Sequence, residues 1–224
     1  MLFRSFVFAF LSLIVMLLAL FAMVLQIRLV TIAGFCPCGG DRVKRHNQLR
    51  NLLAARCKTA GLLPEIEKAN LLPPRPELAG GAEDGSHTSS QRRPADVWVP
   101  QWNLHGPAAL DLAVTSGMRQ GHLAATAADG GRATLDYEVR KCQHQNTFQL
   151  CSSEGLQFLP LVVEGCAGGW GPTATKTWHQ LSAALSARSG ENSSVEQQRL
   201  LQAFAIVLQR ENARAVLRRL DSEA

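Results

Sequence analysis

An uncharged stretch of 22 residues, from Phe6 to Ile27, constrains this chain more than any other feature. Ser12 and Gln26 are its only polar residues. A helix of that length rises about 33 Å, enough to cross a hydrocarbon core of roughly 30 Å. The apolar core of a secretory signal is shorter, at about 7–15 residues. The stretch therefore predicts a transmembrane helix, within a membrane anchor that we assign to residues 1–30.

Basic residues flank this stretch unequally, which predicts its orientation. One precedes it and four follow it closely: Arg4, then Arg28, Arg42, Lys44 and Arg45. Because basic residues favour the cytoplasmic side, we expect a single-pass membrane protein, held in the membrane through residues 6–27, whose C-terminal domain is cytosolic. One alternative is an extracytoplasmic domain with a glycosylation acceptor at 192–194. Another is a nuclear protein whose native start is not this apolar segment.

Charge and composition narrow the functional classes only slightly. The chain has 23 Lys and Arg against 18 Asp and Glu, and setting aside Arg4 and Arg28 leaves an excess of three positive charges. Such a small excess does not by itself indicate a nucleic-acid partner. Ordinary Gly, aliphatic and charge contents exclude a collagen, a disordered chain and a coiled coil. The length is typical of one domain.

Hydrophobic periodicity predicts a mixed α/β sheet flanked by helices. Apolar, β-branched segments predict strands at 95–99, 109–115 and 158–164, and helical spacing predicts helices at 43–60, 134–151, 172–187 and 195–219. We therefore divide the chain into an anchor (1–30), a Cys/His segment with the first helix (31–72), a flexible loop (73–95), an α/β core (96–187) and a basic amphipathic C-terminal helix (188–224).

Asp96 and Asp111 are the two residues with the clearest chemical potential. Asp96 lies at the start of the first predicted strand, and Asp111 lies inside the second. Neighbouring strands are about 4.8 Å apart, so two such carboxylates can reach a common point. One or two carboxylates with phosphate and water form a typical Mg²⁺ site, which assists phosphodiester cleavage. The alternative is that both aspartates only face solvent or cap turns.

Several short motifs, in order, resemble the C-terminal endonuclease domain of non-LTR retroelement polyproteins. That domain belongs to the restriction-endonuclease-like, PD-(D/E)XK class. The motifs are Arg45-His46-Asn47, then Pro94-Ala95-Asp96 followed after fourteen residues by Asp111, then Lys141 in the next predicted helix, the segment 158–164, and Gly168-Gly169-Trp170-Gly171-Pro172. The resemblance covers most of residues 42–220 and implies a restriction-endonuclease-like fold with DNA as the partner.

The resemblance also implies roles for individual residues. Asp96 and Asp111 would hold Mg²⁺ or Mn²⁺, with Glu164 as a further ligand. Lys141 would orient the attacking water or stabilise the developing negative charge. No small-molecule cofactor is implied.

The sequence departs from the family pattern in three places. Ala95 separates Pro94 from Asp96, the segment that follows Asp111 lacks the usual lysine, and the first helix lacks an acidic residue. Two hypotheses follow. The chain is a metal-dependent endonuclease-like domain that cleaves DNA or, as a decayed copy, only binds it. Alternatively, it is a single-pass membrane protein whose cytosolic α/β domain is a non-catalytic interaction module.

Two further groups of residues are weaker candidates. His144 and Asn146 follow Lys141 closely, and Arg210, Arg214 and Arg218 form a row at helical spacing, so these five are candidate phosphate contacts. A solvated helix face explains either group equally well. Cys36, Cys38, His46 and Cys57 are separated by one, seven and ten residues, a spacing that fits no standard zinc site, so no bound zinc is expected.

Overall fold

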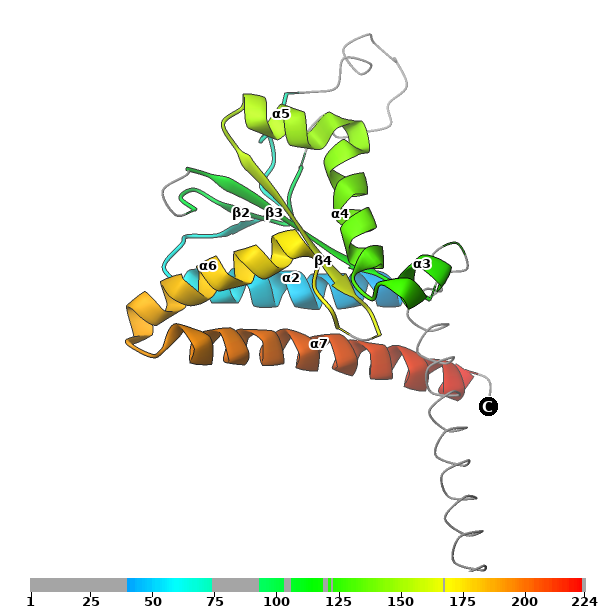
Figure 1. Ribbon diagram of the computed structural model, residues 1–224. Helices are drawn as coiled ribbons and strands as arrows, with labels where there is room; N and C mark the ends of the chain where they lie inside the picture. Colours follow the sequence, from blue (N-terminus) through cyan, green and yellow to red (C-terminus); the bar gives the residue numbers. More distant parts are fainter. Residues whose placement is uncertain are drawn as a thin grey trace, which may run out of the picture.

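A computed structural model of the chain describes residues 40–73, 93–102, 106–118, 121, 123–166 and 168–222. Its centre is a four-stranded sheet in the order β1-β2-β3-β4 (Figure 1). The strands are β1 (Glu65–Ile66), β2 (Val97–Val99), β3 (Ala108–Thr115) and β4 (Gln157–Glu164). Strand β2 is antiparallel to both β1 and β3, and β4 is parallel to β3.

The parallel pairing of β3 with β4 requires a crossover, and helices supply it. These are α3 (Leu123–Ala128), α4 (Arg132–Gln143), the 3₁₀ turn η3 (His144–Asn146) and α5 (Thr147–Ser153). The remaining helices are α2 (Asp41–Thr59), α6 (Pro172–Ser189) and α7 (Ser193–Ser222). The predicted mixed sheet flanked by helices is therefore confirmed.

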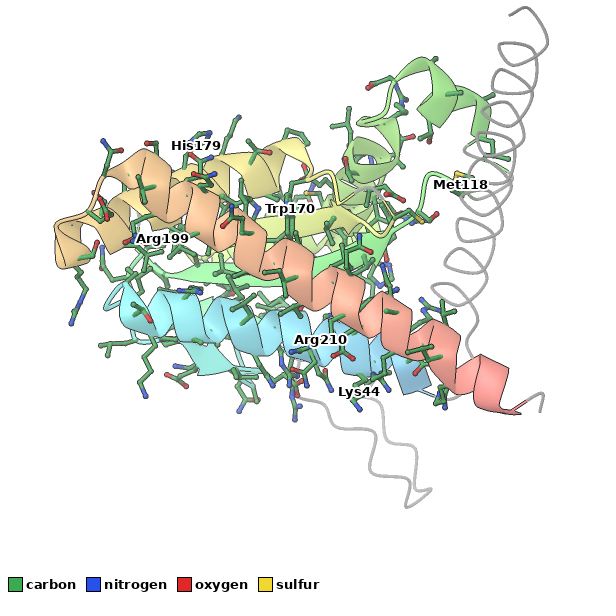
Figure 2. All side chains as sticks on the ribbon, turned by 90° about the horizontal axis from the view of Figure 1, so that it is seen from below. Lys44, Met118, Trp170, His179, Arg199 and Arg210 are labelled. Atoms are coloured by element: carbon green, nitrogen blue, oxygen red, sulfur yellow. The ribbon has the colours of Figure 1, made fainter. Side chains whose placement is uncertain are left out.

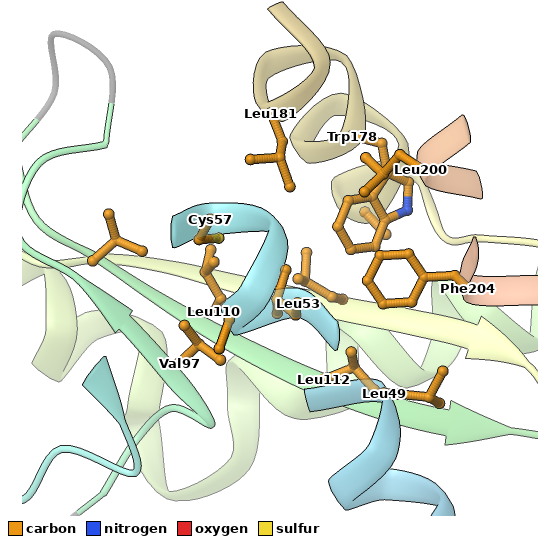
Figure 3. Close-up of a cluster of buried hydrophobic side chains, with 14 of the residues drawn as sticks. Leu49, Leu53, Cys57, Val97, Leu110, Leu112, Trp178, Leu181, Leu200 and Phe204 are labelled. Carbon is orange, nitrogen blue, oxygen red and sulfur yellow. The ribbon is translucent and has the colours of Figure 1, made fainter. Parts of the chain in front are cut away.

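Helices α2 and α6 pack on one face of the sheet, α7 packs across these two helices, and together they enclose the main apolar core. Val97 and Val99 of β2 face this core, as do Leu110 and Leu112 of β3. Figure 3 shows Val97, Leu110 and Leu112 with buried side chains of the three helices, among them Trp178 of α6 and Phe204 of α7. The core thus joins the predicted first helix, the sheet and the C-terminal helix.

The opposite face of the sheet carries α4 and α5 over a smaller apolar cluster (Figure 1). Ala109 of β3 and Phe158 of β4 contribute to it, together with Cys151 of α5. The strand alternation that turns one set of side chains toward α2 turns the next set toward α4. Asp111 belongs to this second set.

The outer edge of β4 is partly covered by its own chain. Glu164 N–H donates to the Gly169 carbonyl at 2.7 Å, and Gly171 N–H donates to the Val162 carbonyl at 2.9 Å. Gln157 N–H points inward to the Pro107 carbonyl. Because strand amides alternate in direction, residue 160 points outward, where Pro160 loses no sheet hydrogen bond. The return segment also fixes Gly171, the residue before α6, on the sheet.

The structure departs from the sequence predictions in two elements. The single helix expected at 134–151 is broken into α4 and α5, because Gln145 and Asn146 adopt left-handed conformations with φ of 53° and 54°. Strand β1, at Glu65–Ile66, was not predicted.

The predicted anchor, residues 1–30, lies outside the described residues, as does most of the predicted loop 73–95. Among the helices of the described ranges, none is long and apolar enough to cross a membrane.

Candidate active site

A pocket of about 430 Å³ opens beside the central strands, between the start of α2 and the middle of α4. Asp96, Asp111 and Lys141, the three residues predicted to act together, all line it. His46 lines it as well, and Arg42, Arg45 and Tyr137 complete its polar wall. The structure therefore brings the three predicted residues to one cavity.

The pairing of β2 with β3 sets the distance between the two aspartates. Val97 pairs with Leu110, and the backbone N–H of Asp96 donates to the Leu110 carbonyl at 3.1 Å. This register places Asp96 beside Asp111 on the neighbouring strand. The Asp96 carboxylate is held further by the Leu112 N–H, which donates to Oδ2 at 2.7 Å.

Lys141 reaches the same point from α4. Its ammonium Nζ lies 3.0 Å from Oδ1 and 2.8 Å from Oδ2 of Asp111. Only 14% of the Asp111 side chain is exposed, and 27% of the Lys141 side chain. In the family pattern the lysine lies on the strand of the second acidic residue, whereas Lys141 lies on α4. Helix α4 packs close enough to β3 for the lysine side chain to reach Asp111.

Burial dominates the electrostatics of Asp111. It raises the pKa of Asp111 from 3.8 to about 6; the nearby Lys141 opposes the rise, and the Asp96 carboxylate adds to it. Burial also works against the charged form of Lys141, but its contacts with Asp111 outweigh this and raise the pKa of Lys141. At neutral pH Asp111 is therefore mainly a carboxylate, held beside the ammonium group of Lys141.

His46 is a member of the site that the sequence analysis did not assign to it. It lies on α2, and its Nε2 donates to Oδ1 of Asp96 at 2.9 Å when the ring proton is on that nitrogen. Its position in Arg45-His46-Asn47, where the resemblance begins, was the available signal. His46 thus orients the Asp96 carboxylate from the side opposite Leu112.

Of the four residues weighed as zinc ligands, the structure describes two, His46 and Cys57, and these two do not lie together. Cys57 lies eleven residues further along α2, about 16 Å away at the helical rise. It is completely buried in the main core, and burial raises the pKa of its thiol to about 12. Cys36 and Cys38 lie outside the described residues.

Asp96 and Asp111 offer oxygen donors, the ligand type that a hard divalent cation prefers. In the described ranges, no group of three or more His, Cys, Asp or Glu side chains is arranged to hold a metal ion. Mg²⁺ needs fewer protein ligands, because it retains waters and shares phosphate oxygens with the substrate. Asp96 and Asp111 supply the one or two carboxylates that such a site requires.

Glu164, predicted as a further metal ligand, lies away from this pocket. It pairs with Thr115 at the far end of β3, whereas Asp111 pairs with Pro160. Four residues of strand separate the two levels by roughly 13 Å. The Glu164 carboxylate is 7% exposed and accepts the N–H of Cys166 at 2.8 Å. Its place in the fold is at the turn after β4.

The arginine row on α7 makes ion pairs within the molecule. Arg214 and Arg218 both contact the carboxylate of Asp41, which is buried at the start of α2. Arg214 also pairs with Glu211 at 2.8 Å, and Arg210 contacts Glu211 at 3.4 Å. Figure 2 shows Arg210 on α7, beside α2. The pairs with Asp41 join α7 to α2. All of these pairs occupy guanidinium groups that were candidate phosphate contacts.

His144 and Asn146 lie on the 3₁₀ turn between α4 and α5. Both are exposed, and neither lines the pocket. They point to solvent at the end of α4 that carries Lys141, so the structure does not bring them into the site.

No protein-family model matches this chain, and no curated protein sequence matches it.

Proposed function

We propose that this chain contains a retroelement-derived, metal-dependent endonuclease-like domain that acts on DNA phosphodiesters. The observation that carries the proposal is the convergence of Asp96, Asp111 and Lys141 on one pocket, from the residue before β2, from β3 and from α4. The mixed sheet, with its two acidic strands side by side, supports the restriction-endonuclease-like fold that belongs to this proposal.

Asp96 and Asp111 would hold the divalent cation, Mg²⁺ or Mn²⁺. When bound, such a cation supplies positive charge at the phosphodiester and makes a coordinated water more acidic. Asp96 is prepared for this role because His46 and the Leu112 amide fix both of its oxygens, and each oxygen retains a second lone pair. Arg42, exposed at the rim of the pocket, is placed to contact a phosphate.

Lys141 has two roles in this proposal. It contacts both oxygens of Asp111, so it compensates the buried charge of that carboxylate in the free protein. If Asp111 held a cation, Lys141 would give up at least one of these contacts. Its ammonium would then be available at the pocket as a point charge for a phosphate oxygen or for the developing negative charge.

The test is cleavage of supercoiled plasmid by the purified full chain, with Mg²⁺ or Mn²⁺ added. We expect nicking by the wild type, its loss in Asp111→Asn, and a strongly reduced but measurable rate in Lys141→Met. Asp136→Asn is the matched control, because it makes the same carboxylate-to-amide change on the outer surface of α4, where Asp136 pairs with Arg132. Cleavage that persists in Asp111→Asn would contradict the assignment.

The second candidate function is a non-catalytic interaction domain of a single-pass membrane protein. The direct Lys141–Asp111 ion pair favours it, because the pair neutralises one of the two carboxylates without any cation. In this proposal residues 6–27 hold the chain in a membrane, with the described domain in the cytosol. A wild type that binds DNA or nothing, cuts nothing, and fractionates with membranes would support this candidate over the nuclease.

A further inference from the structure

Glu138 is a buried carboxylate on α4 that points at the start of α6. Its side chain is 4% exposed. Both of its oxygens accept the backbone N–H of Thr173 at 3.1 Å, and Oε1 also lies 3.4 Å from the N–H of Ala174. Thr173 and Ala174 are the second and third residues of α6. Glu138 therefore serves as the cap of a helix to which it does not belong.

The start of α6 needs this external cap. The first N–H groups of a helix have no partner within the helix, and a side chain at the preceding residue usually accepts one of them. That preceding residue is Gly171, which has no side chain to offer. A Cβ atom placed on Gly171 would overlap Oε1 of Glu138. Glycine at this position is what lets the Glu138 carboxylate reach the amides.

The cap ties α4 to a part of α6 that is held to the sheet and to the main core. Gly171 is hydrogen-bonded to Val162 of β4, and Trp178 of α6 is buried in the main core. The start of α6 therefore cannot shift without disturbing the sheet. The hydrogen bonds of Glu138 therefore hold α4 in place relative to α6 and the sheet.

Lys141 follows Glu138 by three residues, less than one helical turn along α4. One side chain holds α4 to α6, and the other reaches Asp111 on β3. A lysine is long and has many rotamers, so its ammonium is placed accurately only if its backbone is. Displacement of α4 by about 1 Å is enough to lower a rate strongly at a catalytic site.

We propose that Glu138 is a positioning residue: by capping α6 from α4, it fixes the height of α4 over the sheet and holds Lys141 against Asp111. Glu138 does not line the pocket and acts only through Lys141. Its consequence for cleavage rests on the proposed nuclease function, but its effect on the Lys141–Asp111 contact does not.

The first test measures that contact without any activity assay. The coupling between Lys141→Met and Asp111→Asn is obtained from a double-mutant cycle of urea unfolding, in the wild type and in the Glu138→Ala background. We expect the coupling to fall by more than half in Glu138→Ala and to recover partly in Glu138→Gln, which keeps an acceptor oxygen. Coupling that is unchanged in Glu138→Ala would overturn the proposal.

Gly171→Ala tests the same device from the other side. Its φ of −68° suits alanine, so the added methyl group displaces the Glu138 carboxylate without backbone strain and without removing its charge. We expect the same loss of coupling, so the proposal stays testable even if Glu138→Ala does not fold. Gly169→Ala, where a Cβ meets open space, is the matched control and should leave the coupling intact. Equal coupling in both glycine variants would refute the proposal.

Glu196→Ala separates positioning from general loss of stability. Glu196 is also buried and accepts a hydrogen bond from Ser189 at the junction of α6 and α7, far from α4 in the fold. This variant should lose stability while the Lys141–Asp111 coupling stays at the wild-type value. A loss of coupling as large as that in Glu138→Ala would reduce Glu138 to an ordinary stabilising residue.

A cleavage assay adds the catalytic readout. Glu138→Ala should lower kcat about tenfold, with KM for DNA unchanged, and should cause no further loss in the Lys141→Met background. Multiplicative losses in the double variant would contradict action through Lys141. If the wild type cuts nothing, the nuclease proposal fails, and the unfolding cycle still decides whether Glu138 positions Lys141.

Discussion

The two faces of the sheet differ in what they bury. On the α2, α6 and α7 face, large apolar side chains meet in one cluster, where the rings of Trp170, Trp178 and Phe204 lie within 5.4 Å of one another. On the α4 and α5 face the apolar cluster is smaller, and buried polar groups such as Asp111 and Glu138 lie beside it. The first face supplies most of the apolar core, and the second carries Asp111 and Lys141, which form the candidate site together with His46 of α2.

This division has a physical basis. An apolar core gains free energy with each square ångström removed from water, whereas a buried carboxylate costs free energy unless it is paired. Lys141 pairs with Asp111, and the amides of Thr173 and Ala174 pair with Glu138. The apolar core on the other face offsets the remaining free-energy cost of burying these carboxylates.

The largest expected effect is on the apolar face. Phe204→Ala should lower the free energy of unfolding by about 3–5 kcal/mol, because it empties a fully packed position between Trp170 and Trp178. Urea unfolding measures this loss. A loss below about 1 kcal/mol would show that the cluster is not the main source of stability.

The next effect concerns pH and Asp111, which is faced by Lys141, Asp96 and His46. Because its pKa is raised from 3.8 to about 6, the folded protein binds more protons than the unfolded chain between these values. This contribution to stability is therefore present at low pH and is lost as the pH rises through about 6.

Asp111→Asn removes that dependence. As the pH rises from 4 to 7, the free energy of unfolding of the variant should increase relative to that of the wild type by on the order of 1–3 kcal/mol. Parallel urea titrations of both proteins cancel the contributions of other carboxylates. A stability difference that does not change with pH would mean that Asp111 is not desolvated as described.

A smaller effect is expected where polar contacts reinforce the apolar face. Asp41→Asn should cost about 1–2 kcal/mol, since it weakens the contacts of a buried carboxylate with Arg214 and Arg218. Both arginines are partly exposed, so solvent screens the two ion pairs and the loss of stability stays small. The cost should shrink in high salt, and a cost independent of salt would contradict an electrostatic origin.

The smallest effect is expected at the edge of the face that carries the site. Phe148 of α5 is 48% exposed, so Phe148→Ala should change the free energy of unfolding by no more than about 0.5 kcal/mol. Measured beside Phe204→Ala, it sharpens the comparison, because the same chemical change is made on the two sides of the sheet. A loss of several kcal/mol would show that this face has a larger core than described.

The three longer strands and most helices could be predicted from the sequence because their signals are local. Apolar β-branched runs marked β3 and β4, and Pro172 marked the start of α6. The break at Gln145 and Asn146 could not be predicted, because neither a glycine nor a proline marks it. Strand β1 is two residues long, too short for any periodicity.

The site divides in the same way. The proximity of Asp96 and Asp111 followed from their places on consecutive strands. The contact of His46 with Asp96 depends on how α2 is rotated against the sheet, which no local pattern records. The cap that Glu138 gives to α6 joins residues 35 positions apart, and its sequence trace is only a glycine where a capping side chain is usual.

Pro160 has a consequence for how this protein behaves at high concentration. The open border of a sheet invites strands from other molecules, which is one route to fibrillar aggregation. Here the return segment through Gly169 and Gly171 occupies the later half of the β4 border, and Pro160 removes a donor from the earlier half. Two copies that meet edge to edge along β4 would lack a continuous ladder, so replacing Pro160 with valine should make the protein more prone to self-association.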